Sequence, residues 1–130
     1  MTNKIKILVA EDSAVQLNIF TNALREAGFE VIPVGAGPQI YREAVSNHPD
    51  LVLLDIMMPE IDGIEICRNL KRAPNTKDIL IVIHSSKADA DMMDLAHAAG
   101  ADGYIIKFND PGKLVERTRE ILREKLGKEL

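Results

Sequence analysis

The sequence contains one cysteine and no long hydrophobic run. A single thiol excludes an intramolecular disulfide and a metal cluster built on several cysteines, so Cys67 is interpreted as a small buried hydrophobic residue. No apolar run approaches the ~20 residues that a membrane-spanning helix needs, and residues 1–6 are too polar for a signal peptide. We therefore expect a cytoplasmic protein that does not insert into a membrane.

An excess of basic charge is also absent. The 16 Lys and Arg residues are outnumbered by 20 Asp and Glu residues, which gives a net charge of -4 and a pI near 5.4. A chain with this balance has no general attraction for nucleic acid, so we expect no direct DNA binding. The sequence also has no internal repeat, linker or low-complexity tract. Its length suits a single domain over residues 1–130.

Five short apolar runs alternate with segments of helical periodicity. The runs have the length and the flanking turn signals of strands, and the segments between them repeat apolar residues at the spacing of a helix. Strict alternation predicts an α/β fold, in which a doubly wound, five-stranded parallel sheet carries five helices on its two faces. The favoured strand order is 2-1-3-4-5, which is the flavodoxin-like order. The expected strands are residues 5–10, 29–34, 51–54, 79–83 and 103–107.

Charged or polar side chains stand at the ends of four predicted strands. In the predicted order the first and third strands are neighbours, so three carboxylates would meet at the edge where open α/β sheets bind ligands. Close carboxylates repel one another unless some are protonated or a cation joins them. A hard divalent cation bound through oxygen, Mg²⁺ or alternatively Mn²⁺, is the economical solution. The residues are Glu11 and Asp12 after the first strand, Asp55 after the third, Ser85 after the fourth and Lys107 in the fifth.

Two simpler interpretations remain open at this point. Asp55 taken alone could merely cap the segment that follows it. A different strand order would leave the three acids separately solvated. The whole set nevertheless suits phosphoryl transfer, because an aspartate can form an acyl phosphate and Lys107 could neutralise a phosphoryl oxygen. Ser85 could donate a hydrogen bond to another oxygen, and its loop would then have two states.

Four motifs point to a family. They are Glu11-Asp12, residues 54–63 (LDIMMPEIDG), residues 85–87 (SSK) and residues 99–107 (AGADGYIIK). With these motifs the chain resembles the receiver domain of bacterial two-component response regulators, of the single-domain chemotaxis-regulator kind, along essentially its whole length. The resemblance implies that Asp55 accepts a phosphoryl group from the phosphohistidine of a sensor histidine kinase or a histidine phosphotransfer protein. The chain would then be a phosphoacceptor signalling domain and not an enzyme.

The same resemblance implies a metal site beside the phosphoacceptor. Mg²⁺ would be held by Asp12, Asp55 and the backbone carbonyl of Met57, and Glu11 would assist through a water molecule. Lys107 would contact the phosphoryl group.

The resemblance also implies a conformational switch. Ser85 would be the hydroxyl that contacts the phosphoryl group, and Tyr104 would be the aromatic side chain that moves inward with it. A downstream protein effector would bind the face that residues 88–125, from Ala88 to Lys125, build.

Two residues near the predicted site depart from a simple pattern. The family usually has a proline joined by a cis bond after the lysine, but this chain has Phe108. A cis bond before a non-proline residue costs about 2.5–4 kcal/mol, so we expect a trans Lys107–Phe108 bond and a rearranged loop through Asn109. His84 could titrate beside Ser85, but neighbouring strand residues face opposite ways, so we expect it to pack away from the site.

Three rival functions fit parts of this pattern. A haloacid-dehalogenase-like phosphatase also uses a strand-end aspartate, but it places a second Asp where this chain has Met57. A flavodoxin-like cofactor binder would need hydroxyls and glycines in the first loop, where Glu11 and Asp12 would repel a phosphate. A receiver-like docking scaffold that acts without phosphorylation is the remaining alternative, and Phe108 keeps it open.

Overall fold

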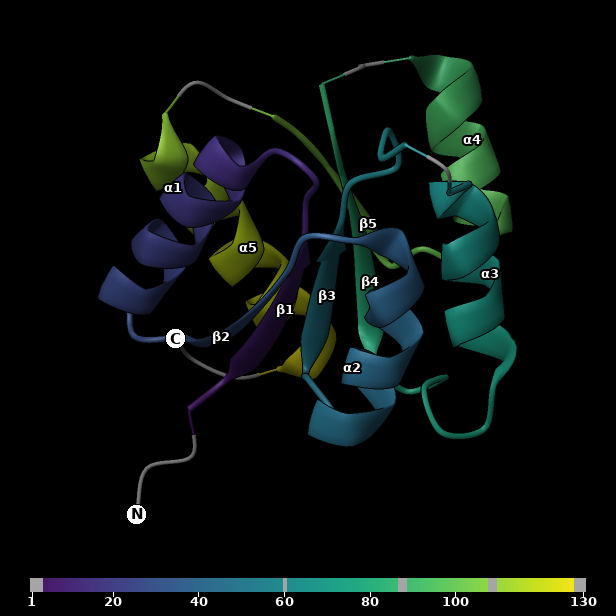
Figure 1. Cartoon of the computed structure of the whole chain (residues 1–130), viewed down its shortest axis with the longest axis horizontal. Helices are drawn as coiled ribbons and strands as arrows, with labels where there is room; N and C mark the ends of the chain where they lie inside the picture. Colours follow the sequence, from purple (N-terminus) through teal and green to yellow (C-terminus); the bar gives the residue numbers. More distant parts are fainter. Residues whose placement is uncertain (1–3, 60, 87–88, 108–109, 128–130) are drawn as a thin grey trace.

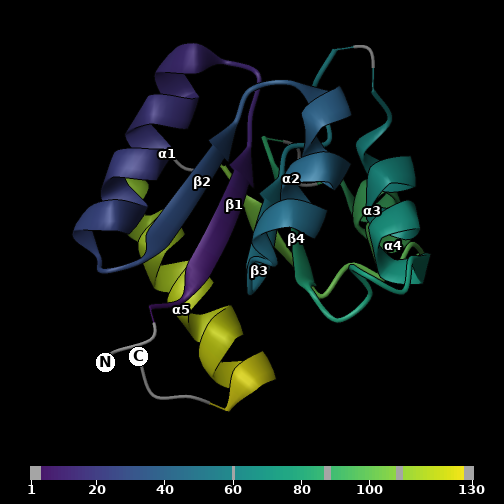
Figure 2. The ribbon, with the colours of Figure 1, turned by 60° about the horizontal axis from the view of Figure 1, so that its bottom comes forward.

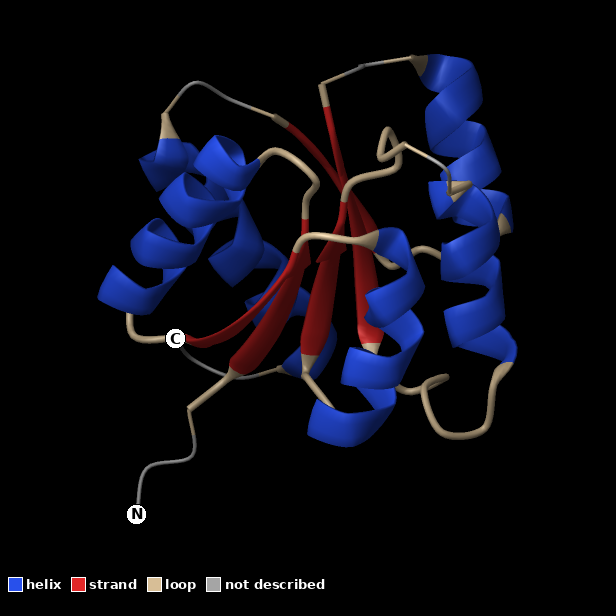
Figure 3. Cartoon of the chain, in the orientation of Figure 1, coloured by secondary structure: helices blue, strands red, loops and turns tan. Residues whose placement is uncertain are grey.

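The computed structural model describes residues 4–59, 61–86, 89–107 and 110–127. Within these residues, five strands form one sheet at the centre of the molecule (Figure 1, Figure 3). All neighbouring strands are parallel and their order is β2-β1-β3-β4-β5, which confirms the predicted fold class. The strands are β1 (Lys6–Ala10), β2 (Glu30–Val34), β3 (Leu51–Leu54), β4 (Leu80–Ser85) and β5 (Gly103–Ile106).

Helices cover both faces of this sheet. Figure 2 shows α1 and α5 together on one face and α2, α3 and α4 on the other. A short 3-10 helix, Gly37–Gln39, precedes α2. The α-helices in the described part of the chain are α1 (Ala14–Glu26), α2 (Ile40–Asn47), α3 (Gly63–Arg72), α4 (Ala90–Ala98) and α5 (Pro111–Leu126).

Short polar side chains cap the starts of several helices, and left-handed residues follow the last residues of α2 and α5. A side-chain oxygen accepts a backbone N–H at the start of four helices, which satisfies a donor that the helix itself leaves without a partner. The capping residues are Ser13, Asp62, Asp89 and Asp110. Helix α2 ends at His48, whose φ of 46° is left-handed, although extended backbone is expected before a proline. Its N–H bonds the Ala44 carbonyl, so the helix cap prevails over the pre-proline preference.

Each face of the sheet has its own hydrophobic core. Alternate strand residues point to opposite faces, so Leu8 packs with α2, α3 and α4, whereas Ile7 packs with α1 and α5. All of β3 is inaccessible to solvent, which explains why its sequence is a continuous apolar run. Cys67 is fully buried in the first of these cores, and burial raises the pKa of its thiol to about 11. This agrees with its interpretation as a buried hydrophobic residue.

The strand order places the ends of β1 and β3 side by side. Ala10 and Leu54 are register partners, and the Asp55 N–H donates to the Ala10 carbonyl at 3.1 Å. Glu11 and Asp55 therefore leave the sheet together. Strand β4 continues through Ser85, two residues beyond the predicted end at residue 83, and the Lys107 N–H donates to the Ser85 carbonyl at 2.7 Å. The strand ends thus bring four elements to one edge.

Among the described residues, no helix combines the length and the apolar character needed to cross a bilayer.

Candidate functional site

Three acidic side chains gather at the carboxyl edge of the sheet. Carboxylate oxygens of Glu11, Asp12 and Asp55 lie within 4.8 Å of one another. Glu11 and Asp55 are each only 2% exposed, whereas Asp12 is exposed. The first two residues come from the end of β1 and the third from the end of β3, as the strand order requires. The set is made of hard oxygen donors and is therefore compatible with a divalent cation such as Mg²⁺.

Lys107 brings a positive charge into this acidic group. Its Nζ donates to Glu11 Oε1 at 2.5 Å, to Asp55 Oδ2 at 3.0 Å and to Gln16 Oε1 at 3.1 Å. The lysine side chain is 14% exposed and the two carboxylate side chains are 3% exposed. These ion pairs are therefore largely shielded from water, and they fix the ammonium beside the Asp55 carboxylate.

Asp55 accepts hydrogen bonds from a side chain and from the backbone. Besides Lys107, the backbone N–H of Met57 donates to Asp55 Oδ1 at 2.9 Å. Burial would raise the pKa of Asp55, but hydrogen bonds from Glu11, from the Met57 N–H and from Lys107 outweigh burial and hold this pKa below its usual value. Asp55 is therefore ionised at neutral pH, which is the state that a nucleophilic carboxylate needs.

Glu11 has the opposite tendency. Burial and the hydrogen bond with Asp55 together raise the pKa of Glu11 to about 7, although Lys107 acts in the opposite direction. The two carboxyl groups share the ammonium, so their titrations are linked. Glu11 is consequently suited to support a charge on Asp55, because near neutral pH it can carry the proton that Asp55 gives up.

The two predicted switch residues lie on neighbouring strands. Ser85 is fully buried at the end of β4, and Tyr104 is half-buried in β5. Tyr104 packs against the core under α4 and lines, with Met93 and His97, a small cavity of about 220 Å³. The half-buried position of Tyr104 would allow its ring to move between a buried and a solvent-exposed placement. The switch roles themselves stay predictions.

His84 faces away from the carboxylates, as strand alternation predicts. Its ring meets the Phe20 ring edge-to-face at a centroid distance of 4.8 Å, on the side of the sheet covered by α1 and α5. His84 Nε2 is buried and has no hydrogen-bond partner within the part of the chain that the structure describes. Burial, assisted by the charge of Lys107, lowers the pKa of His84 to about 4. The ring is therefore neutral at physiological pH.

Several predictions concern residues outside the described ranges. The trans Lys107–Phe108 bond and the rearranged loop through Asn109 are among them, as is Lys87 of the third motif. The predicted effector face includes α4, β5 and α5, but Ala88 at its start also lies outside the described residues.

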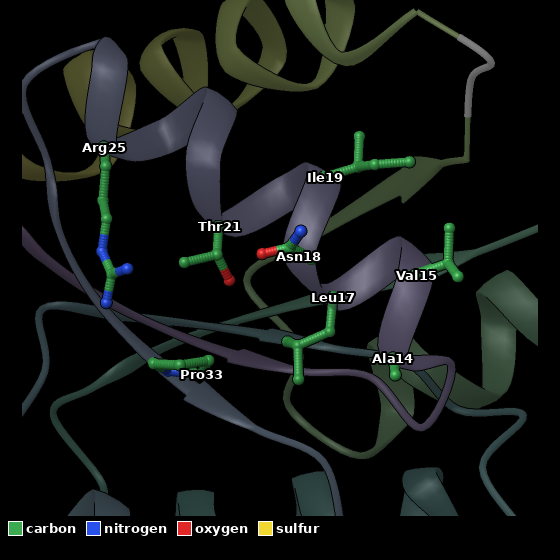
Figure 4. Close-up of a pocket in the computed structure, with 8 residues that line it drawn as sticks. All are labelled: Ala14, Val15, Leu17, Asn18, Ile19, Thr21, Arg25 and Pro33. Carbon is green, nitrogen blue, oxygen red and sulfur yellow. The ribbon is translucent and has the colours of Figure 1, made fainter.

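A separate hollow lies between α1 and the edge strand β2. Its cavity volume is about 570 Å³, and Leu17, Thr21, Arg25 and Pro33 are among its lining residues (Figure 4). The carboxylates and Lys107 do not line it. Arg25 reaches from α1 to the Val31 carbonyl at 3.2 Å, which closes part of the open edge of the sheet. The hollow is thus distinct from the acidic site.

Sequence reasoning missed Gln16, which contacts Lys107. The only sequence signal at this position is the spacing Ser13-x-x-Gln16, which is typical of a helix capping box and predicts a contact with the backbone. Sequence reasoning also missed the donation of the Met57 N–H to Asp55, because the fold of the loop after β3 determines it.

These features define a flavodoxin-like α/β domain with an acidic, lysine-bearing site at the strand ends. The chain matches the family described as the response regulator receiver domain over residues 7–119. It therefore belongs to this family of two-component signalling domains, which confirms the resemblance found in the sequence.

Solved structures and curated relatives agree with this assignment. The chemotaxis protein CheY4 of Vibrio cholerae has the same fold, with a TM-score of 0.87 and 22% identity over 92% of this chain and 100% of that chain. The DNA-binding response regulator MtrA of Mycobacterium tuberculosis (strain ATCC 25618 / H37Rv) is 38% identical over 122 residues, which are 94% of this chain and 52% of MtrA. The phosphate regulon transcriptional regulatory protein PhoB of Pseudomonas aeruginosa is 38% identical over 117 residues, 90% of this chain and 51% of PhoB.

The relatives correct one prediction about partners. The acidic composition of the chain predicted no direct DNA binding, yet MtrA is named a DNA-binding response regulator. The chain spans about half the length of the curated relatives that it matches. The prediction was wrong because the net charge of a receiver domain describes that domain alone and says nothing of DNA binding by a protein that contains it.

Proposed function

We propose that Asp55 is the phosphoacceptor of this receiver domain. The observation that carries the proposal is the buried, ionised Asp55 carboxylate at the end of β3, held 3.0 Å from the Lys107 ammonium. A carboxylate in its ionised form can attack phosphorus, and the adjacent ammonium can neutralise charge on the transferred group. The phosphodonor would be a protein phosphohistidine, as on a sensor histidine kinase or a histidine phosphotransfer protein.

In the proposed reaction an Asp55 oxygen attacks the phosphorus atom of phosphohistidine. An O–P bond forms, the N–P bond breaks, and the imidazole nitrogen keeps the electron pair and takes up a proton. Lys107 then pairs with a phosphoryl oxygen in place of the carboxylate oxygen, and Ser85 donates to another oxygen. Because a phosphoryl group and not an external substrate is the cargo, the domain acts as a signalling switch and does not turn over substrates.

The carboxylates Asp12 and Asp55 would hold Mg²⁺, with Mn²⁺ as the alternative ion. Glu11 would assist through water, and the Met57 carbonyl would be a further ligand. Bound Mg²⁺ would shield the carboxylates from the incoming anion and neutralise charge on the transferred group. The fit rests on oxygen donors that already lie within 4.8 Å of one another.

Phosphorylation would draw the Ser85 hydroxyl to the phosphoryl group and move the Tyr104 ring inward with it. We further propose that the receiver unit covers residues 1–130, since buried Ile121 and Leu122 extend its core beyond the matched residues 7–119. A cytoplasmic location is part of the same proposal, because histidine phosphodonors and their acceptors must meet in one compartment.

The direct test is phosphorylation by acetyl phosphate, a small phosphodonor, followed by intact mass. With Mg²⁺ the wild-type chain should gain one phosphoryl group, and Asp55→Asn should gain none. Removing Mg²⁺ with a chelator should slow the reaction by at least an order of magnitude, because electrostatic stabilisation of this kind is worth roughly 10²-fold or more.

Asp62→Asn is a matched control, because Asp62 is an acid of the same loop that caps α3 with its side chain. An adduct of undiminished yield on Asp55→Asn, or no adduct on the wild type, would contradict the proposal. The second result would favour the docking scaffold that acts without phosphorylation.

A further inference from the structure

Gln16 connects helix α1 to the end of β5. It lies in the first turn of α1, and its amide oxygen accepts a hydrogen bond from the Lys107 ammonium at 3.1 Å. The two residues are 91 positions apart in the sequence. The contact therefore depends on the tertiary structure and is not a by-product of local chain geometry.

The side chain of Gln16 is diverted from the contact that its local sequence predicts. In a capping box, the residue at this position turns back to the N–H of the capping residue. Here the Gln16 N–H donates to Ser13 Oγ at 3.3 Å, which is the first half of such a box. The Ser13 N–H donates to Glu11 Oε2 at 3.4 Å, and the Gln16 amide oxygen is directed to Lys107. Local rules of this kind are set aside mainly at functional positions.

Gln16 also differs in kind from the other partners of Lys107. A lysine ammonium has three N–H donors, and here they face Glu11, Asp55 and Gln16. The two carboxylates belong to the acidic group and change their charge or their partners when the site is used. The Gln16 amide is neutral and lies outside that group, so its hydrogen bond to Lys107 does not depend on the charge of the carboxylates.

We propose that Gln16 is a positioning residue for Lys107. It holds the ammonium beside Asp55 while Glu11 and Asp55 exchange partners. Lysine needs such an anchor because its four-carbon stem is flexible and its charge is not fixed by bidentate geometry. This inference rests on the proposed function of Asp55, since the consequence of a displaced ammonium is slower phosphoryl transfer.

The test replaces the amide and keeps the length of the side chain. Gln16→Met should slow phosphorylation by acetyl phosphate in saturating Mg²⁺ by roughly three- to ten-fold, as expected for the net contribution of one solvent-accessible hydrogen bond. Asn18→Leu is the matched control, because it also replaces an exposed amide of α1 with an apolar side chain. It should react at the wild-type rate, within about two-fold, because a surface substitution away from the site usually changes a free energy by no more than about 0.5 kcal/mol.

A double-mutant cycle separates positioning from a structural effect. In a Lys107→Met background, Gln16→Met should cause no further loss of rate, because the group that it positions is gone. An equal loss in both backgrounds would show that Gln16 acts through the stability of α1, and this result would overturn the proposal. A wild-type rate for Gln16→Met would overturn it as well.

A second measurement does not require phosphorylation. Without phosphodonor, acetic anhydride should acetylate Lys107 several-fold faster in Gln16→Met than in the wild type, as followed by peptide mass. Equal acetylation rates would overturn the positioning role. If the wild type took up no phosphate while acetylation still rose in the variant, the phosphoacceptor function would fail and the contribution of Gln16 to holding Lys107 would stand.

Discussion

The Lys107 ammonium is shared by oxygens that come from three elements of the fold. Glu11 follows β1, Asp55 follows β3 and Gln16 belongs to α1. Removal of one partner from a buried ion pair leaves an uncompensated charge, which is far more destabilising than the pair itself is stabilising. The arrangement is therefore sensitive to single substitutions, and it can also respond to a single added charge such as a phosphoryl group.

His84 gives a pH test of the packing on the other face of the sheet. Burial lowers its folded-state pKa to about 4, from an ordinary value of 6.5. Between these values the unfolded chain binds a proton and the folded protein does not, so the contribution of His84 to stability falls as the pH falls from 6.5 toward 4.

We compare the change in unfolding free energy that His84→Leu causes at two pH values. This change should be about 2 kcal/mol more stabilising at pH 5 than at pH 7.5, since each pKa unit corresponds to about 1.4 kcal/mol. Urea unfolding of both proteins at the two pH values measures this difference. The same measurement on His97→Leu, which removes an exposed histidine of α4, is the control for the loss of a surface histidine. Equal effects of His84→Leu at both pH values would mean that the buried ring is not held neutral.

The sequence predicted the strand-end residues of the site but not the contact made by Gln16, and the difference has a physical reason. Glu11, Asp12, Asp55 and Lys107 could be placed together because each stands at a strand end, and parallel strands bring their ends to one edge. Gln16 could not be placed, because a helical side chain meets a distant partner only when the helix has docked at a particular angle. Its capping-box spacing pointed instead to the backbone.

The loop that follows β3 is the element on which the site geometry depends. It carries Met57, whose N–H donates to Asp55, and it ends at Gly63, the first residue of α3. A Cβ atom on Gly63 would lie 2.4 Å from the Cα of Ile56, which is backbone and cannot move aside easily. Glycine at this position therefore lets the loop pack closely against the start of α3.

Gly63→Ala should lower the unfolding free energy by roughly 1–3 kcal/mol, as overpacking of a close contact does. It should also slow phosphorylation, because the displaced Ile56 adjoins Asp55. Gly35→Ala is the control, since a Cβ atom there would meet its nearest neighbour, Leu17 Cδ2, at an ordinary 3.8 Å. Urea unfolding and acetyl phosphate kinetics measure the two effects. Similar losses for both variants would contradict the role given to Gly63.

The strands and helices were largely predictable from the sequence, but their first and last residues were less so. The alternation of apolar runs with segments of helical periodicity was sufficient to predict the five strands and their order in the sheet. The extension of β4 through Ser85 was not predicted, because His84 and Ser85 are polar and their burial becomes visible only in the folded structure. The left-handed His48 was also missed, since helix capping prevailed there over the preference of a residue before proline.

At the scale of the whole molecule, the site lies where the two layers of helices separate. The chain leaves β1 for α1 on one face of the sheet and leaves β3 for α3 on the other face, so the carboxyl ends of β1 and β3 are left open between them (Figure 1). Two independent cores, one on each face, make the sheet a rigid support for side chains from four strands. Whole-molecule charge was the least informative feature of the sequence, because it led to the wrong expectation about DNA.

Chemical mapping of the modified residue tests the central claim most directly. Borohydride reduces an aspartyl phosphate to homoserine, and peptide mass then identifies the modified position. After treatment of the wild-type chain with Mg²⁺ and acetyl phosphate, we predict homoserine at position 55. The absence of homoserine, or its appearance at Asp12 with residue 55 unchanged, would contradict the assignment of Asp55 as the phosphoacceptor.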